Sequence, residues 1–179
     1  MVHHMMGEYA QSNIFLEEAY ILGQDYRTNY GDQALALVVN QRVTEYRGEP
    51  FEMLMIHYFK AMNFTALGQL DAALVECRRL IIELNALNDR HESKNRYARD
   101  AFIHNLMGML YEASGDHNNA FIAYRNALEI YLEDYQELFG VNAPHQLKKD
   151  LLRTAHRNGF RDELRRYEAQ FDMQFEEEE

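Results

Sequence analysis

The segment from His104 to Leu128, HNLMGMLYEASGDHNNAFIAYRNAL, carries the pattern that decides the fold. Apolar residues recur in it at a spacing of three and four, which is typical of amphipathic helices. Gly115 interrupts this spacing and indicates a left-handed turn between two helices. Gly108 and Ala120 are small enough to let those helices approach closely, and Tyr124 is large enough to fill the space beside them. The segment therefore predicts a hairpin of two antiparallel helices.

The same pattern occurs 47 residues earlier, between Phe51 and Leu84. Seven positions correspond at this one offset: His57, Lys60, Ala61, Phe64, Gly68, Ala73 and Cys77 align with His104, Met107, Gly108, Tyr111, Gly115, Ala120 and Tyr124. A weaker copy follows, in which Gly159 lies 44 residues after Gly115. The chain is therefore predicted to be all-α and to consist of repeated helical hairpins.

These glycine, alanine and tyrosine positions resemble those of the tetratricopeptide repeat family, over about residues 51–128. The resemblance implies helical-hairpin repeats stacked into a short right-handed α-α superhelix. His57 and His104 stand where the family usually has Trp, and each is expected to pack within its own helix pair. The offset of 47 exceeds the family's usual period of about 34, so elongated inter-repeat helices are expected.

A closer resemblance rests on three phrases of the sequence. They are Gly48–Phe51 leading to Ile56–Tyr58, then Ala73–Leu80, and Asp150–Arg153. These phrases are similar to an uncharacterised bacterial family of repeat-containing lipoproteins of the cell envelope. The resemblance implies a periplasmic or envelope-associated protein, and a cytoplasmic location is the alternative. It also implies a lipid-attachment signal and further C-terminal sequence, neither of which occurs in these 179 residues.

The helix-capping and helix-breaking residues of the sequence predict a single repeat domain over residues 13–175. Its units are expected at about 13–47, 50–100, 101–140 and 144–172. Residues 1–12 are expected to form a polar leader that is disordered or foreign to the natural chain, and 176–179 an acidic tail. Ser12 and Asn13 are expected to cap the first helix.

Further boundaries follow from capping and breaking residues. Asp32 is expected to cap a second helix, in which Ala36 would take the place of Ala120. A long helix is expected to continue past Asn85 and to end in a solvated turn around 88–95. The helix after Gly115 is expected to run to Gly140, and Pro144 to open the next one.

Composition excludes several classes of protein. A formal net charge of −11 argues against a nucleic-acid partner, which requires clustered cations. One cysteine, Cys77, excludes an internal disulfide framework. No run of 18 apolar residues occurs, so no transmembrane segment is expected in this chain.

Catalytic and metal sites are also not expected. The eight histidines include no HExxH pair, and none of them has ligand spacing on one helix face. No serine or cysteine has the context of an activated nucleophile. The chain is therefore predicted to be non-enzymatic, with no cofactor and no metal.

The first helix of each tetratricopeptide hairpin lines a concave groove, and the groove positions of this chain are predicted to bind a peptide or partner helix. The partner-binding candidates are Met55, Tyr58, Met62, Phe102, Asn105, Met109, Lys149 and Arg153. Thr65, Glu112, Gln146 and His156 occupy the remaining groove positions. Exposed methionine and aromatic side chains suit adaptable hydrophobic recognition.

Three alternatives remain open at this stage. The same surfaces could drive self-association in a structural module of an envelope assembly, which would make the chain a homo-oligomer. Elongated helices could instead cover the groove and bury it as ordinary core. Small-ligand binding is the third option, retained because the histidines are many.

Overall fold

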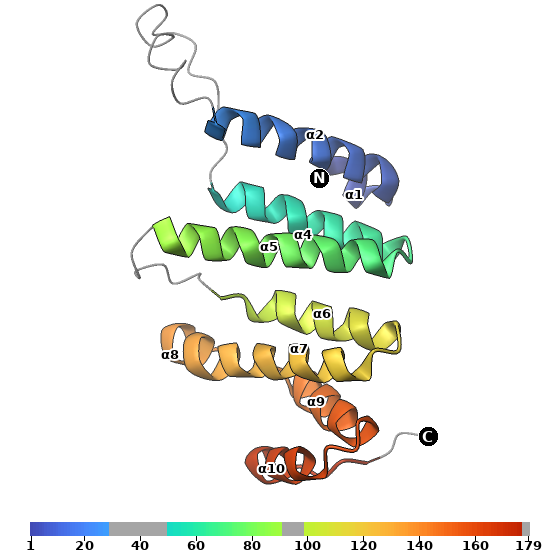
Figure 1. Cartoon of the computed structure of the whole chain (residues 1–179), viewed down its shortest axis with the longest axis vertical. Helices are drawn as coiled ribbons and strands as arrows, with labels where there is room; N and C mark the ends of the chain where they lie inside the picture. Colours follow the sequence, from blue (N-terminus) through green and yellow to red (C-terminus); the bar gives the residue numbers. More distant parts are fainter. Residues whose placement is uncertain (29–49, 91–98, 177–179) are drawn as a thin grey trace, which may run out of the picture. The chain divides into compact units, whose positions relative to one another are not determined.

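The computed structural model describes residues 1–28, 50–90 and 99–176, and every regular element in this part of the chain is helical (Figure 1). The predicted all-α class is therefore confirmed for these residues. The helices are α1 (Val2–Met5), α2 (Tyr9–Thr28), α4 (Pro50–Ala66), α5 (Leu70–Arg90), α6 (Ala101–Ala113), α7 (His117–Ile130), the π-helical turn η1 (Tyr131–Tyr135), α8 (Gln136–Phe139), α9 (His145–Arg157) and α10 (Arg161–Phe171).

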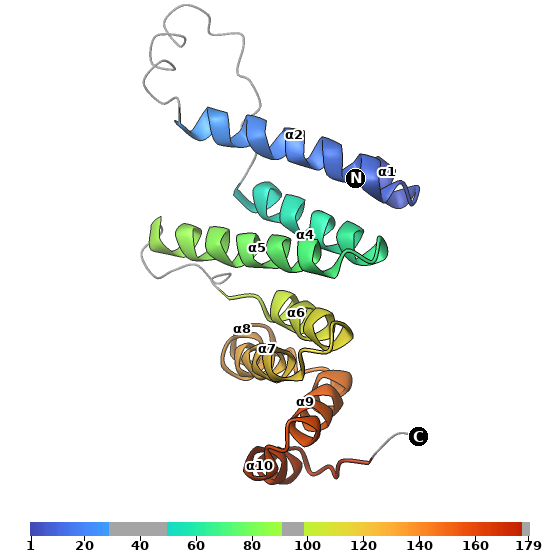
Figure 2. The same ribbon diagram turned by 45° about the vertical axis from the view of Figure 1, so that its right-hand side comes forward.

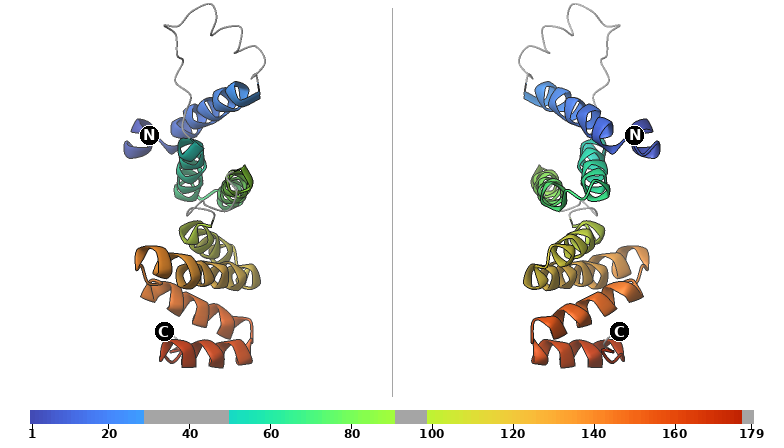
Figure 3. Two further views of the ribbon diagram at one scale, coloured as in Figure 1. Left: turned by 90° about the vertical axis from the view of Figure 1, so that its left-hand side faces the viewer. Right: turned by 90° about the vertical axis from the view of Figure 1, so that its right-hand side faces the viewer.

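The chain divides into two compact units, which are described separately. The first is Met1–Glu76 and the second is Cys77–Glu179, so the boundary falls inside α5. In the first unit, α2 runs alongside α4 (Figures 1 and 2). In the second, α6 and α7 form an antiparallel hairpin and α9 and α10 form another (Figures 2 and 3).

One turn geometry recurs four times in the described chain. Gly7, Gly68, Gly115 and Gly159 all have φ between 70° and 81°, in the left-handed region. In each turn the glycine N–H bonds the carbonyl three residues before it, and the next N–H bonds the carbonyl five residues before itself. This is the Schellman ending of a helix, which satisfies carbonyls that have no partner within the helix. The predicted turns at Gly68, Gly115 and Gly159 are confirmed.

The turn at Gly7 corrects the prediction of a disordered leader over residues 1–12. These residues form α1 and the beginning of α2 instead. Ser12 and Asn13 were expected to cap a helix, but both lie within α2 and are buried. Ser12 stands five residues after Gly7, the same separation as that of Ala73 and Ala120 from their glycines, so its small side chain suits close packing.

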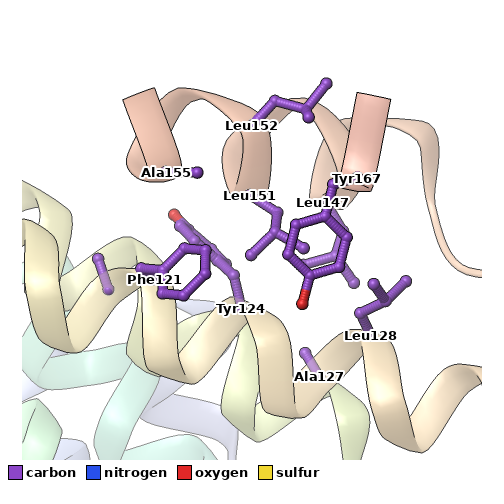
Figure 4. Packing of buried hydrophobic residues seen from close by; sticks show 10 residues of the cluster. Phe121, Tyr124, Ala127, Leu128, Leu147, Leu151, Leu152, Ala155 and Tyr167 are labelled. Atoms are coloured by element: carbon purple, nitrogen blue, oxygen red, sulfur yellow. The ribbon is translucent and has the colours of Figure 1, made fainter. Parts of the chain in front are cut away.

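The core of the second unit lies between α7, α9 and α10 (Figure 4). Phe121 and Tyr124 of α7 face Leu147 and Leu151 of α9, and Tyr167 of α10 completes the cluster. All five side chains are at least 97% buried. Burying side chains of this size stabilises the fold by about 1.5–3 kcal/mol each relative to leaving them in water.

The helix that follows Gly115 is long, as the sequence predicts. α7 continues through η1 and α8, and Gly140 ends it in the left-handed conformation with φ of 64°. The π-helical turn was not foreseen. Arg99 pairs there with Glu133 and Asp134, at 2.7 Å each.

The other long helix, α5, extends past Asn85 to Arg90. Residues 88–90 belong to α5, and the rest of the turn expected around 88–95 lies outside the described residues. The helix predicted after Asp32, including Ala36, lies wholly outside them.

Candidate functional site

The predicted groove positions of the second unit come from α6 and α9. We call this surface the α6–α9 face and define it as Phe102, Asn105, Met109 and Glu112 of α6 with Gln146, Lys149, Arg153 and His156 of α9. The sequence forms α6 here because Asp100 accepts a hydrogen bond from the Ile103 N–H at 3.0 Å and caps the helix.

One side of α6 is packed and the other is open. Ile103 and Leu110 are at least 98% buried, whereas Phe102 is 46% exposed and Met109 43% exposed. Asn105 lies between the two exposed residues, one helical turn after Phe102 and four residues before Met109. Its Oδ1 atom is buried and has no hydrogen-bond partner among the described residues. This side of α6 thus offers two large apolar side chains, and the buried Asn105 oxygen is not exposed to a ligand.

Glu112 ties α6 to α9. Arg153 binds both of its carboxylate oxygens at 2.7 Å, and Arg157 adds a contact of 3.0 Å. The Tyr124 hydroxyl donates to the same carboxylate at 3.0 Å. Arg153 also pairs with Asp150 at 2.7 Å. Bidentate pairing of this kind fixes geometry as well as adding energy.

The network accounts for the ionisation of Glu112. Burial alone raises the pKa of this carboxyl, but the hydrogen bonds and charge of Arg153, with Tyr124 and Arg157, outweigh burial and hold the pKa below its usual value. Burial, with the nearby carboxylates of Asp150 and Glu112, raises the pKa of the Tyr124 hydroxyl. The carboxylate therefore stays charged and the phenol neutral near pH 7.

We expect the contribution of Glu112 to stability to be lost in acid. Its folded-state pKa lies below the unfolded value of 4.5, so this contribution is complete above pH 4.5 and disappears as the pH falls through the folded pKa. At pH 7 a Glu112→Gln variant should be less stable than the intact chain by about 1.5–3 kcal/mol, the range for hydrogen bonds to charged groups.

Urea unfolding at a series of pH values measures this difference. The gap in stability between the two proteins should narrow steadily as the pH is lowered below 4.5. A gap that stays constant between pH 7 and pH 3 would contradict this assignment.

The structure gives different roles to the two cationic candidates on α9. Arg153 is 27% exposed and its guanidinium is engaged with Glu112 and Asp150 of its own chain. Lys149 is exposed. At the end of the helix, the ring of Phe175 stacks on His156 with centroids 4.5 Å apart and planes at 27°. The α9 part of the face is thus partly occupied by the chain itself.

The remaining predicted candidates belong to α4 in the first unit. Met55 is 36% exposed, and Tyr58 and Met62 are half-buried. These three residues belong to the first unit and are therefore not part of the α6–α9 face.

A buried charged cluster in the first unit was not predicted. His57, Lys60 and Glu76 are each at least 96% buried. The Glu76 carboxylate pairs with His57 Nδ1 at 2.7 Å and with Lys60 Nζ at 2.8 Å, and Lys60 also pairs with Glu17. His57 does pack inside the unit, edge to face with Tyr20 at 4.9 Å, but it does so as part of an ionic cluster.

A second buried polar group lies beside this cluster. The Asn63 amide donates to Ser12 Oγ at 3.0 Å and to Asn13 Oδ1 at 2.8 Å, and its oxygen contacts His4 Nδ1 at 2.6 Å. These bonds join α1, α2 and α4. The side chains of His57, Lys60 and Glu76 are only 0–5% exposed.

The alignment of the two repeats contains one indication that polar residues are buried in the first unit. Lys60, Asn63 and Glu76 lie 47 residues before Met107, Leu110 and Ala123, which are apolar. A charged or amide residue at a repeat position that is elsewhere apolar indicates a buried polar partner. Which residues pair could not be read from the sequence, because the partners are 16 to 59 positions apart.

The described part of the chain has no metal-binding cluster and no membrane-spanning helix. Within residues 1–28, 50–90 and 99–176, no cluster of three or more His, Cys, Asp or Glu side chains is arranged to hold a metal ion. None of the helices described is both long and apolar enough to cross a membrane. Comparisons of the chain with protein-family models, with curated proteins and with solved structures found no match.

Proposed function

We propose that this chain is a non-enzymatic interaction module of tetratricopeptide type, and that its α6–α9 face binds an extended peptide. The observation that carries the proposal is the exposure of Phe102 and Met109 on the side of α6 opposite the one formed jointly by the buried Ala101, Ile103, Gly108 and Leu110. Exposed apolar side chains that share one helix face are typical of recognition surfaces.

Rigidity of the frame supports the same proposal. The pairing of Glu112 with Arg153 and Arg157 joins α6 to α9, so the face need not be ordered when a ligand arrives. A preorganised surface binds with a smaller entropic cost than a mobile one.

The proposal predicts a specific loss of binding in a Met109→Asp variant. Peptides selected from a random display library on the intact chain should bind this variant at least about tenfold more weakly, because a charge would replace a buried apolar contact at the interface. Fluorescence anisotropy with labelled peptides measures the change.

Ile122→Asp on α7 is the matched control, because Ile122 is 37% exposed and Met109 is 43% exposed. Circular dichroism checks that both variants are folded. Equal binding by the two folded variants would count against the α6–α9 face.

Self-association is the second candidate, and one observation favours it. Ile14, Ile21 and Leu22 of α2 are 51–58% exposed and share one helix face. A mass in sedimentation equilibrium that rises with concentration would favour this candidate, whereas a constant monomer mass would leave peptide binding. An envelope location and small-ligand binding remain predictions from the sequence.

A further inference from the structure

The segment that follows α10 is held against α9. Asp172 ends α10 with φ of 50° and ψ of 47°, and it is the one non-glycine residue with positive φ in the described chain. Figure 1 shows the chain then running back past α10 towards the turn between α9 and α10. Asp residues tolerate this left-handed conformation better than most.

Two hydrogen bonds fix the start of this segment. The Met173 N–H bonds the Glu168 carbonyl at 3.1 Å, and the Phe175 N–H bonds the Glu168 carboxylate at 2.9 Å. Met173 and Phe175 pack against the core cluster of the second unit, whereas Gln174 and Glu176 are exposed. The alternation shows that the segment lies extended with one apolar side inward.

The contact is made on a predicted groove position. Phe175 stacks on His156, the last α9 residue of the α6–α9 face, with centroids 4.5 Å apart. Phe171, the last residue of α10, provides a similar contact about two turns earlier on α9, because the Lys148 ammonium lies 5.4 Å from its ring centroid. Phe171 at the end of α10 and Phe175 after it thus lie against a lysine and a histidine of α9.

Charge complements this contact. α9 carries four Lys or Arg residues, two His and a single Asp in 13 residues, although the whole chain has a net charge of −11. The sequence after Phe175 is four consecutive glutamates. A peptide with such a run of carboxylates would gain favourable electrostatic energy on approaching a helix that carries more cations than carboxylates.

We propose that α9 is the part of the face that selects the partner, and that it binds peptides in which an aromatic residue is followed by a run of carboxylates. The chain's own Phe175–Glu176 segment is the resident occupant of this site and competes with such a partner. The inference rests on the proposed function, since it names the ligand chemistry of the same face.

Competition between the tethered segment and a free peptide determines how much more weakly the peptide binds the intact chain. A segment tethered within a few residues of its site acts at an effective concentration in the millimolar range, by the general behaviour of short linkers. A free peptide of the same sequence with a dissociation constant near 0.1 mM would then bind the intact chain roughly tenfold more weakly than an uncovered one.

The test uses a labelled synthetic peptide, FDMQFEEEE, which reproduces Phe171–Glu179. Anisotropy titrations compare the intact chain, Phe175→Ala and the matched control Gln174→Ala, whose side chain is exposed. Phe175→Ala is expected to bind the peptide about tenfold more tightly than the other two proteins. Three changes should each weaken binding of the peptide to Phe175→Ala by about tenfold. They are addition of His156→Ala to that variant, replacement of the second Phe of the peptide by Ala, and a rise in salt concentration.

The proposal would be overturned if all three folded proteins bound the peptide equally well, or if none of them bound it. If library peptides of different chemistry still bind in a Met109-dependent way, the proposed function stands and only this inference falls. If Phe175→Ala does not fold, the intact chain is titrated with the unlabelled peptide to millimolar concentration. Displacement of the Phe175 amide signal in nuclear magnetic resonance then supports the proposal, and an unmoved signal contradicts it.

Discussion

A Gly108→Ala variant is expected to lose about 3 kcal/mol of unfolding free energy, the upper part of the range for overpacked cores. A Cβ atom at this position would lie 2.3 Å from Cε1 and 2.4 Å from Cδ1 of Tyr124. The ring has no room to retreat, since Tyr124 is 1% exposed and its hydroxyl is bound to Glu112. The loss should be read from urea unfolding followed by circular dichroism.

Helix propensity predicts the opposite sign for this substitution. Ala is favoured over Gly by about 1 kcal/mol in a helix interior, so a variant more stable than the intact chain would contradict the close approach of α6 and α7. In a Tyr124→Leu background the same substitution should cost much less, because the atoms that the new Cβ meets are gone. The difference between the two backgrounds measures the contact directly.

A Glu76→Ala variant is expected to lose about 3–5 kcal/mol, the usual cost of removing one partner of a buried ion pair. Lys60 and His57 would lose their shared carboxylate while remaining at least 96% buried. Burial alone raises the pKa of Glu76, but His57 and Lys60 outweigh it and hold the pKa below its usual value. The carboxylate is therefore charged in the folded chain near pH 7.

The control for this prediction comes from the other repeat. Replacing both charges by the aligned residues, as Lys60→Met with Glu76→Ala, should cost less than Glu76→Ala alone, because no buried ammonium then lacks its buried partner Glu76. Urea unfolding of the two variants at pH 7 gives the comparison. A single variant within 0.5 kcal/mol of the intact chain, the usual range for surface substitutions, would show that the cluster is solvated rather than buried.

Local patterns predicted the hairpins well. Gly68, Gly115 and Gly159 each need a left-handed φ that L side chains rarely adopt, so their spacing revealed the turns. Gly7 has the same geometry but was missed. The residues that it brings inward are Ser12 and Asn13, and polar residues carry no hydrophobic periodicity.

Long-range polar contacts set the limit of the prediction. The Asn63 amide donates hydrogen bonds to Ser12 and Asn13, which lie about 50 residues earlier in the sequence. The sequence around these residues contains no pattern that predicts the pairing. Arg153 was predicted as a ligand contact from its position in the repeat. Its engagement with Glu112 depends on how α6 and α9 meet, which the pattern of one helix cannot give.

The most direct test of the α6–α9 face is a nuclear magnetic resonance footprint of a library-selected peptide on the intact chain. Amide shifts confined to Phe102–Glu112 of α6 and to the exposed side of α9 are the predicted result. Shifts that instead gather on the outer side of α7, or on the exposed α2 residues Ile14, Ile21 and Leu22, would contradict it.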